Sequence, residues 1–125
     1  MTRQIISTPD APRAASYSQA VVAGGLVFVS GTGPYDPATW AIVGTTIEEQ
    51  TRQALTNIAA ILAAAGSSVE QVVSATFILR NAEDFPGFNE EWVRWFPTDP
   101  PARQGAKLPI DTAGLLISIA VIAAA

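Results

Sequence analysis

The chain has 125 residues, of which 49% are hydrophobic and only 14% are charged, and its formal net charge is −4. This length predicts a single domain, residues 1–125, and the shortage of charge favours a subunit that buries part of its surface in an oligomer. The seven Lys and Arg residues are scattered singly, which argues against a nucleic-acid partner, and no apolar stretch is long enough to span a membrane.

The first predicted elements are two short β-prone runs, residues 19–23 and 26–30, which flank Gly24-Gly25. Two glycines between such runs are typical of a tight hairpin. The stretch from Ser30 to Pro34 ends the second strand, and a short extended piece is expected near Ile42.

The strongest helix signal begins at Thr46, which is followed three residues later by Glu49 in a capping-box pattern. Behind it, apolar residues recur at helical spacing, and Gly66 is a natural C-terminal stop. The residues of this apolar stripe are Leu55, Ile58, Ile61, Leu62 and Ala65.

The second half of the chain predicts a long strand at 69–79, a helix at 84–96 and two further strands at 103–107 and 115–123. Prolines at 97, 100 and 101 end the helix. The apolar side of this helix carries Phe85, Phe88, Trp92, Trp95 and Phe96, whereas Glu90 and Glu91 are expected on a solvated face.

This order of elements predicts an α+β domain of two layers, with two helices on one face of a single sheet. The last strand is apolar on both of its alternating faces, so one face can lie beneath the helices while the other needs a second covering partner. In a two-layer domain, that partner is most simply another copy of the chain.

Cysteine and histidine are both absent, which excludes disulfides, thiolate nucleophiles, Ser-His-Asp catalysis and metal sites built on Cys or His. We therefore expect no cofactor and no metal ion. The N-terminus has no apolar signal-peptide core, and we expect a cytoplasmic protein.

The segment Pro101-Ala102-Arg103 carries the most distinctive candidate site residue. A guanidinium in an apolar setting requires an anionic partner, and its planar fork of donors matches a carboxylate. Arg103 is therefore either a clamp for a substrate carboxylate or one half of an internal ion pair, and spacing alone does not separate the two.

Five features in this order resemble the RidA/YjgF family of reactive-intermediate (enamine/imine) deaminases, also labelled endoribonuclease L-PSP. They are Tyr17, Val27–Gly31, Asp84–Asn89, Pro101–Arg103 and Ile117–Ala120. The resemblance implies a chorismate-mutase-like fold and a homotrimer whose sheets line a central barrel, with three pockets between subunits. It also implies that Arg103 grips a small carboxylate-bearing substrate and that Tyr17, Ser30, Gly31 and Asn89 line the pocket.

These residues also have simpler interpretations. Ser30-Gly31 is compatible with a strand-ending turn, Asn89 with a helix-surface amide, and Tyr17 with a hydrophobic lid. Trp92 and Trp95 are expected to serve as core or interface packing.

The sequence departs from the family at Ser118, which stands where the deaminating members carry a glutamate that activates water. A serine hydroxyl holds a water molecule but does not accept its proton near neutral pH without a base beside it. Asp111, in an altered loop, is an alternative acid. The function predicted from the resemblance is deamination of 2-imino or enamine acids with Arg103 and Ser118 as catalytic residues. The alternatives are a non-catalytic trimer that binds small carboxylates or partners, or a relative recruited to other imine or enamine chemistry.

Overall fold

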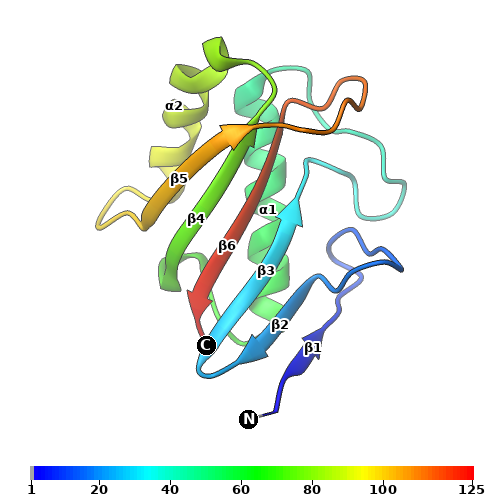
Figure 1. The fold of residues 1–125 in the computed structure, drawn as a ribbon, viewed down its shortest axis with the longest axis vertical. Helices are drawn as coiled ribbons and strands as arrows, with labels where there is room; N and C mark the ends of the chain where they lie inside the picture. The colour runs from blue at the N-terminus through cyan, green and yellow to red at the C-terminus, as the bar shows by residue number, and fades with distance from the viewer. Residues whose placement is uncertain (1) are drawn as a thin grey trace.

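The computed structural model describes residues 2–125. A six-stranded mixed sheet forms one layer, and two helices lie behind one of its faces (Figure 1). The strands are β1 (Gln4–Ile6), β2 (Ala20–Ala23), β3 (Leu26–Thr32), β4 (Val72–Leu79), β5 (Ala102–Lys107) and β6 (Ile117–Ala124). The helices are α1 (Ile47–Ala64) and α2 (Phe85–Trp95), and the 3₁₀ turns η1 (Val69–Gln71) and η2 (Ala82–Asp84) precede β4 and α2. The predicted α+β class is confirmed.

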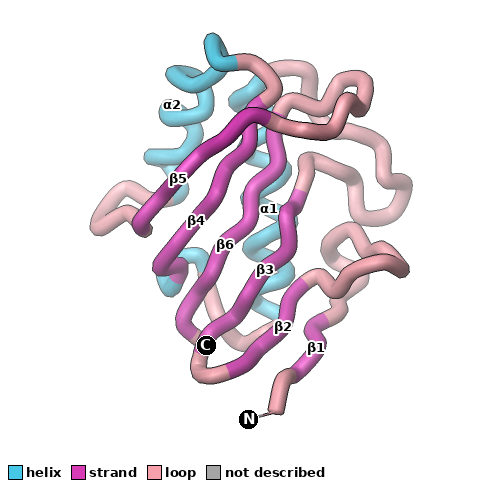
Figure 2. The backbone as a smooth tube through the Cα atoms, in the orientation of Figure 1, coloured by secondary structure: helices cyan, strands magenta, loops and turns pink. Residues whose placement is uncertain are grey.

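The strands follow the spatial order β1-β2-β3-β6-β4-β5, so β6, the last in the sequence, lies at the centre of the sheet (Figure 2). All neighbouring strands are antiparallel except β4 and β5, which run parallel. Parallel strands need a crossover connection, and α2 is part of it. The crossover places α2 beside the edge strand β5, where Arg103 lies.

The predicted start and end of α1 are confirmed. The Thr46 side chain accepts a hydrogen bond from the Glu49 backbone N–H (3.2 Å), while Glu49 Oε1 accepts one from the Thr46 N–H (3.1 Å). Gly66 follows the helix with a φ of 78°, a conformation that a residue with a side chain rarely adopts. The apolar stripe is almost fully buried at Leu55, Ile58, Ile61 and Leu62.

The alternation predicted for the last strand is also confirmed. Ile117, Ile119, Val121 and Ala123 of β6 are buried on the helix side. The intervening residues are only partly buried on the opposite face, which we call the open face because no helix in residues 2–125 covers it (Figure 2). The neighbouring β3 adds Phe28, which is 43% exposed and pairs with Ile122.

The expectation for Glu91 is wrong: this side chain is buried rather than solvated. It forms an ion pair with Arg52 of α1 (3.0 Å) and accepts a hydrogen bond from Trp95 Nε1 (3.0 Å). Burial raises the pKa of Glu91, but hydrogen bonds from Arg52 and Trp95 outweigh it and hold the pKa below its ordinary value. Glu91 therefore joins α2 to α1, a contact that helical spacing alone does not predict.

Three buried amide side chains hold the loops that surround the sheet. Gln19 donates to the carbonyls of Thr8, Ala11 and Pro12. Gln50 joins the carbonyls of Gly44 and Gly114 to the N–H of Leu116, and Asn57 donates to the carbonyls of Gly33 and Tyr35. Neither these contacts nor the short strand β1 was predicted from the sequence.

Candidate functional site

Arg103 lies on the exposed edge strand β5, directly opposite Ala75 of β4. Its Nη1 donates a hydrogen bond to Oδ1 of Asn89 on α2, at 2.8 Å. The sequence separates these residues by 14 positions, and the β4-α2-β5 crossover brings them together.

Four aromatic rings surround the guanidinium of Arg103. Its central carbon lies 5.0 Å from the ring centre of Phe77, 5.6 Å from Phe85, 5.3 Å from Phe88 and 5.4 Å from Trp92. Cations are attracted to aromatic faces at such distances. The rings also displace water, and this desolvation lowers the pKa of Arg103 from its ordinary value. The guanidinium is thus fixed in orientation and partly dehydrated.

No carboxylate in residues 2–125 pairs with Arg103. The ion pairs found in this part of the chain join Arg52 to Glu91 and Arg80 to Asp111. The neutral amide of Asn89 is the side-chain partner of Arg103 instead. The internal-ion-pair alternative is therefore wrong for the described residues.

A second group of predicted site residues gathers where β3 and β6 meet. The β3–β6 register shifts between Val29 and Thr32, which places Gly31 in an irregular part of the strand. A Cβ atom added to Gly31 would lie 3.3 Å from Oγ of Ser118, so a larger residue would crowd that hydroxyl. Gly31 and Ser118 are therefore direct neighbours.

Ser30 and Tyr17 border this group. The Ser30 hydroxyl donates to the carbonyl of Ser18 (2.6 Å), so it holds the loop that carries Tyr17. Tyr17 is 47% exposed and lines a cavity of about 390 Å³ beside Arg13. Burial raises the pKa of the nearby Tyr35 hydroxyl, and Tyr17 raises it further.

The two groups lie on opposite faces of the sheet. Arg103 pairs with Ala75, which is buried on the helix side, whereas Ser118 pairs with Ile78, three positions further along β4. Side chains alternate between faces along a strand, so an odd separation reverses the face. Two strand spacings and three residue rises place the Cα atoms of Arg103 and Ser118 roughly 14 Å apart. A single chain therefore pairs Arg103 with Asn89 and Ser118 with Gly31, but does not unite all four.

The alternative acid, Asp111, is already paired. Its Oδ1 lies 2.8 Å from Nη1 of Arg80, and its side chain is 93% exposed. Arg80 also donates to the backbone carbonyls of Thr112 and Leu115, at 2.6 Å each. Arg80 thus anchors the loop that carries Asp111, a role that no local pattern in the sequence predicts.

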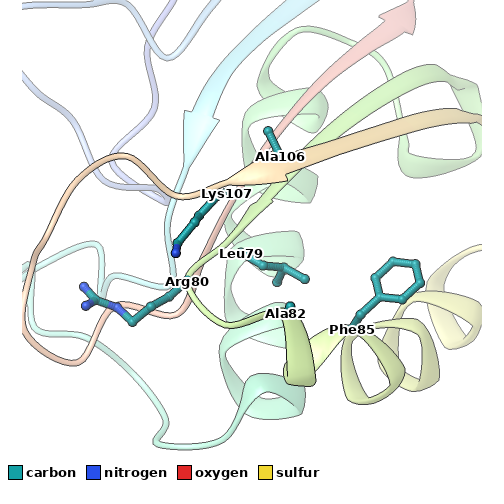
Figure 3. A pocket seen from close by; sticks show the side chains of 6 residues that line it. All are labelled: Leu79, Arg80, Ala82, Phe85, Ala106 and Lys107. Carbon is teal, nitrogen blue, oxygen red and sulfur yellow. The ribbon is translucent and has the colours of Figure 1, made fainter.

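A cavity of about 410 Å³ opens where β4 and β5 end, beside the start of α2 (Figure 3). It is lined by Leu79, Arg80, Ala82, Phe85, Ala106 and Lys107. Phe85 also borders Arg103, so the cavity adjoins the first group of site residues.

Residues 2–125 contain no cluster of three or more His, Cys, Asp or Glu side chains suited to a metal ion. No helix among them combines the length and apolarity that a bilayer crossing requires.

Comparison with known proteins identifies the family. The model of the family described as endoribonuclease L-PSP matches residues 8–125. The chain belongs to this family, which is also called RidA/YjgF. It is 42% identical to a RutC family protein of Saccharolobus solfataricus, covering 97% of each chain. It is also 42% identical to the 2-iminobutanoate/2-iminopropanoate deaminase of Capra hircus, covering 87% of this chain and 82% of that one.

The fold comparison agrees. The structure of E. coli TdcF with bound serine superposes on this RidA/YjgF chain with a TM-score of 0.89 at 31% identity, covering 98% of each chain. The sheet and both helices therefore match that structure over nearly the whole chain.

Proposed function

We propose that this chain is a RidA-like enzyme acting on small 2-imino or enamine carboxylic acids, in which Arg103 binds the substrate carboxylate. The guanidinium carries this proposal. It is oriented by Asn89 and four rings, and no carboxylate of residues 2–125 neutralises it. A substrate carboxylate supplies the missing charge and accepts two parallel N–H···O bonds from the planar fork. The 42% identical Capra hircus protein, named for 2-iminobutanoate and 2-iminopropanoate, supports this substrate class.

We further propose that the single chorismate-mutase-like domain of residues 1–125 assembles as a homotrimer whose open faces line a central barrel. Two observations support it: the open face is largely apolar, and Arg103 and Ser118 project from opposite faces of one sheet. A pocket that uses both residues needs a second copy. In this arrangement Arg103 and Asn89 come from one subunit, while Tyr17, Ser30, Gly31 and Ser118 come from its neighbour.

The proposed reaction is hydrolysis of the C=N bond. Water adds across the C=N bond, its oxygen to the carbon and one of its protons to the nitrogen, to give a carbinolamine. The C–N bond then breaks as the remaining hydroxyl proton passes to the nitrogen, which leaves as ammonia, and a 2-oxo acid remains. The hydroxyl of Ser118, next to Gly31, holds the water but does not take its proton. Orientation by Arg103 then supplies most of the catalysis, and wild-type turnover is weak. A cytoplasmic location stays a prediction from the sequence.

The paired Asp111 favours a second candidate, a non-catalytic trimer that binds small carboxylates or a partner protein. With Asp111 held by Arg80 and serine at position 118, neither position offers a free base. The lack of a free base is also compatible with a family member that carries out other imine or enamine chemistry, in which no water has to be activated.

A coupled assay separates these candidates. An amino-acid oxidase generates 2-iminopropanoate in place, and pyruvate formation is followed with and without the protein. A rate above the spontaneous hydrolysis that disappears in Arg103→Ala supports the enzyme. Binding of pyruvate without any rate increase supports the non-catalytic trimer.

A further inference from the structure

The cavity beside Phe85 has no role in the reaction proposed above. Its volume of about 410 Å³ falls in the range of small-molecule sites. Leu79, Ala82 and Phe85 provide apolar walls, while Lys107 and Arg80 lie along the opposite side (Figure 3). The cavity is therefore apolar in its walls and cationic at one end.

The two cations at that end are not equivalent. Arg80 is occupied by Asp111 and by the carbonyls of Thr112 and Leu115, so it serves the loop that carries Asp111. Lys107 is exposed, and no ion pair involving it is found in residues 2–125. No carboxylate lines the cavity within this part of the chain. Lys107 thus borders an apolar cavity and has no acidic partner among residues 2–125.

Lys107 also lies in line with Arg103. Both residues belong to β5 and, at an even separation, project from the same face of the sheet. Four residue rises separate their Cα atoms by about 13 Å. Between them lies Gly105, and the Phe77 ring occupies the space that a side chain at this position would fill. Phe85 borders both Arg103 and the cavity.

This line of groups matches an elongated substrate with an anion at each end. A carboxylate bound by Arg103 directs the rest of the molecule past Phe85 and over the apolar wall toward Lys107. At the far end, a second carboxylate of a molecule such as 2-oxoglutarate or 2-oxoadipate would accept a charge-assisted hydrogen bond from Lys107.

We propose, on the basis of the function proposed above, that this cavity is the pocket for the substrate side chain and that Lys107 binds a distal carboxylate. The preferred substrates are then imines or enamines of 2-oxo dicarboxylic acids, in place of the short monocarboxylic ones. Lys107 determines specificity, whereas Arg103 binds the carboxylate common to both classes.

Calorimetry with 2-oxoglutarate and 2-oxobutanoate tests the proposal through the ratio of their affinities. We expect wild type to favour 2-oxoglutarate by about tenfold, the size of one charge-assisted contact. Lys107→Gln should reduce the ratio to about one, and Lys107→Arg should keep most of it. Arg94→Gln is the matched control, because it also removes one exposed positive charge but lies at a different cavity, beside Trp95.

A wild-type ratio near one, or a high ratio that Lys107→Gln leaves unchanged, overturns the role of Lys107. If 2-oxobutanoate binding is still lost in Arg103→Ala in that case, the proposed function stands while the dicarboxylate preference falls. If neither acid binds to wild type, both proposals fall together.

Discussion

The region around Arg103 and the region around Ser118 are built differently. Arg103 has its orientation set within one chain by Asn89 and four aromatic rings, and it lacks only an anion. Ser118 lies on the open face next to Gly31, among apolar neighbours that no helix of residues 2–125 covers. The first region is thus ordered within one chain, whereas in the trimer proposed above the second becomes a pocket only against a neighbouring copy.

The largest expected effect comes from disrupting the open face. Phe28→Glu places a charge in the proposed trimer contact, where an unpaired buried charge costs several kcal/mol. Light scattering behind size exclusion should give wild type three times the mass of the 13.1 kDa chain. The variant should have the mass of one chain and lose turnover.

Val93→Glu is the matched control, because Val93 is 56% exposed on α2, away from the open face. A monomeric wild type at micromolar concentration, or a trimeric Phe28→Glu, would refute the shared pocket.

Removing the guanidinium tests the region around Arg103. Arg103→Ala should weaken 2-oxobutanoate binding by roughly 2 to 4 kcal/mol, the range for loss of a charge-assisted bidentate contact in a site that the proposed trimer encloses. Arg103→Lys should restore only part of this, because the planar fork is lost. Calorimetry measures both variants, and equal affinities for wild type and Arg103→Ala would exclude the clamp.

A substitution that introduces a base tests the region around Ser118. Ser118→Glu should raise the rate of 2-iminopropanoate hydrolysis by about 10²-fold, the low end of general-base assistance. Burial in a partly apolar pocket raises the pKa of the new carboxyl, while Arg103 of the neighbouring copy in the proposed trimer lowers it. The coupled assay compares it with Ser74→Glu, which adds the same charge to the open face beside Ile122, away from Gly31.

Wild-type turnover already as fast as that of a glutamate-bearing relative would contradict this account, because another group would then have to carry the proton.

A smaller effect should separate two interpretations of Asn89. If its amide positions Arg103, Asn89→Ala should weaken binding of 2-oxobutanoate by about tenfold, the value of one hydrogen bond to a charged group. Asn89→Asp should weaken binding further, because it gives Arg103 an internal carboxylate that competes with the ligand. Unchanged affinity in both variants would mean that Asn89 is only a surface amide.

The smallest effect on binding, but a measurable one on stability, is expected at Glu91. Glu91→Ala leaves Trp95 Nε1 without a partner and should lower the free energy of unfolding by roughly 1 to 3 kcal/mol. The folded-state pKa of Glu91 lies below its ordinary value of 4.5, so its stabilisation is complete above pH 4.5 and is lost as the pH falls through the folded-state value.

Urea unfolding at several pH values checks this, with exposed Glu90→Gln as the control. Glu91→Gln should lose this part of the acid sensitivity, and an unaltered pH profile in that variant would contradict the assignment.

Local signals in the sequence determined much of the fold. The capping box and Gly66 set the ends of α1, the paired glycines set the β2–β3 hairpin, and strict alternation set the two faces of β6. Each of these rests on contacts within a few residues or on a simple period, so a pattern alone predicts it. The family resemblance also followed from residues spread along the chain, and the match over residues 8–125 confirms it.

Only the tertiary structure decided what surrounds the candidate site residues and the buried charge. No local sequence pattern shows that four rings from β4 and α2 surround Arg103. Nor does one show that Arg80 forms an ion pair with Asp111 or that Glu91 is buried against α1. Nor does spacing show that Arg103 and Ser118 face opposite ways, because this depends on the register of β5 and β6 against β4. These contacts join elements distant in sequence, and only packing determines which side chains meet and which lose their water.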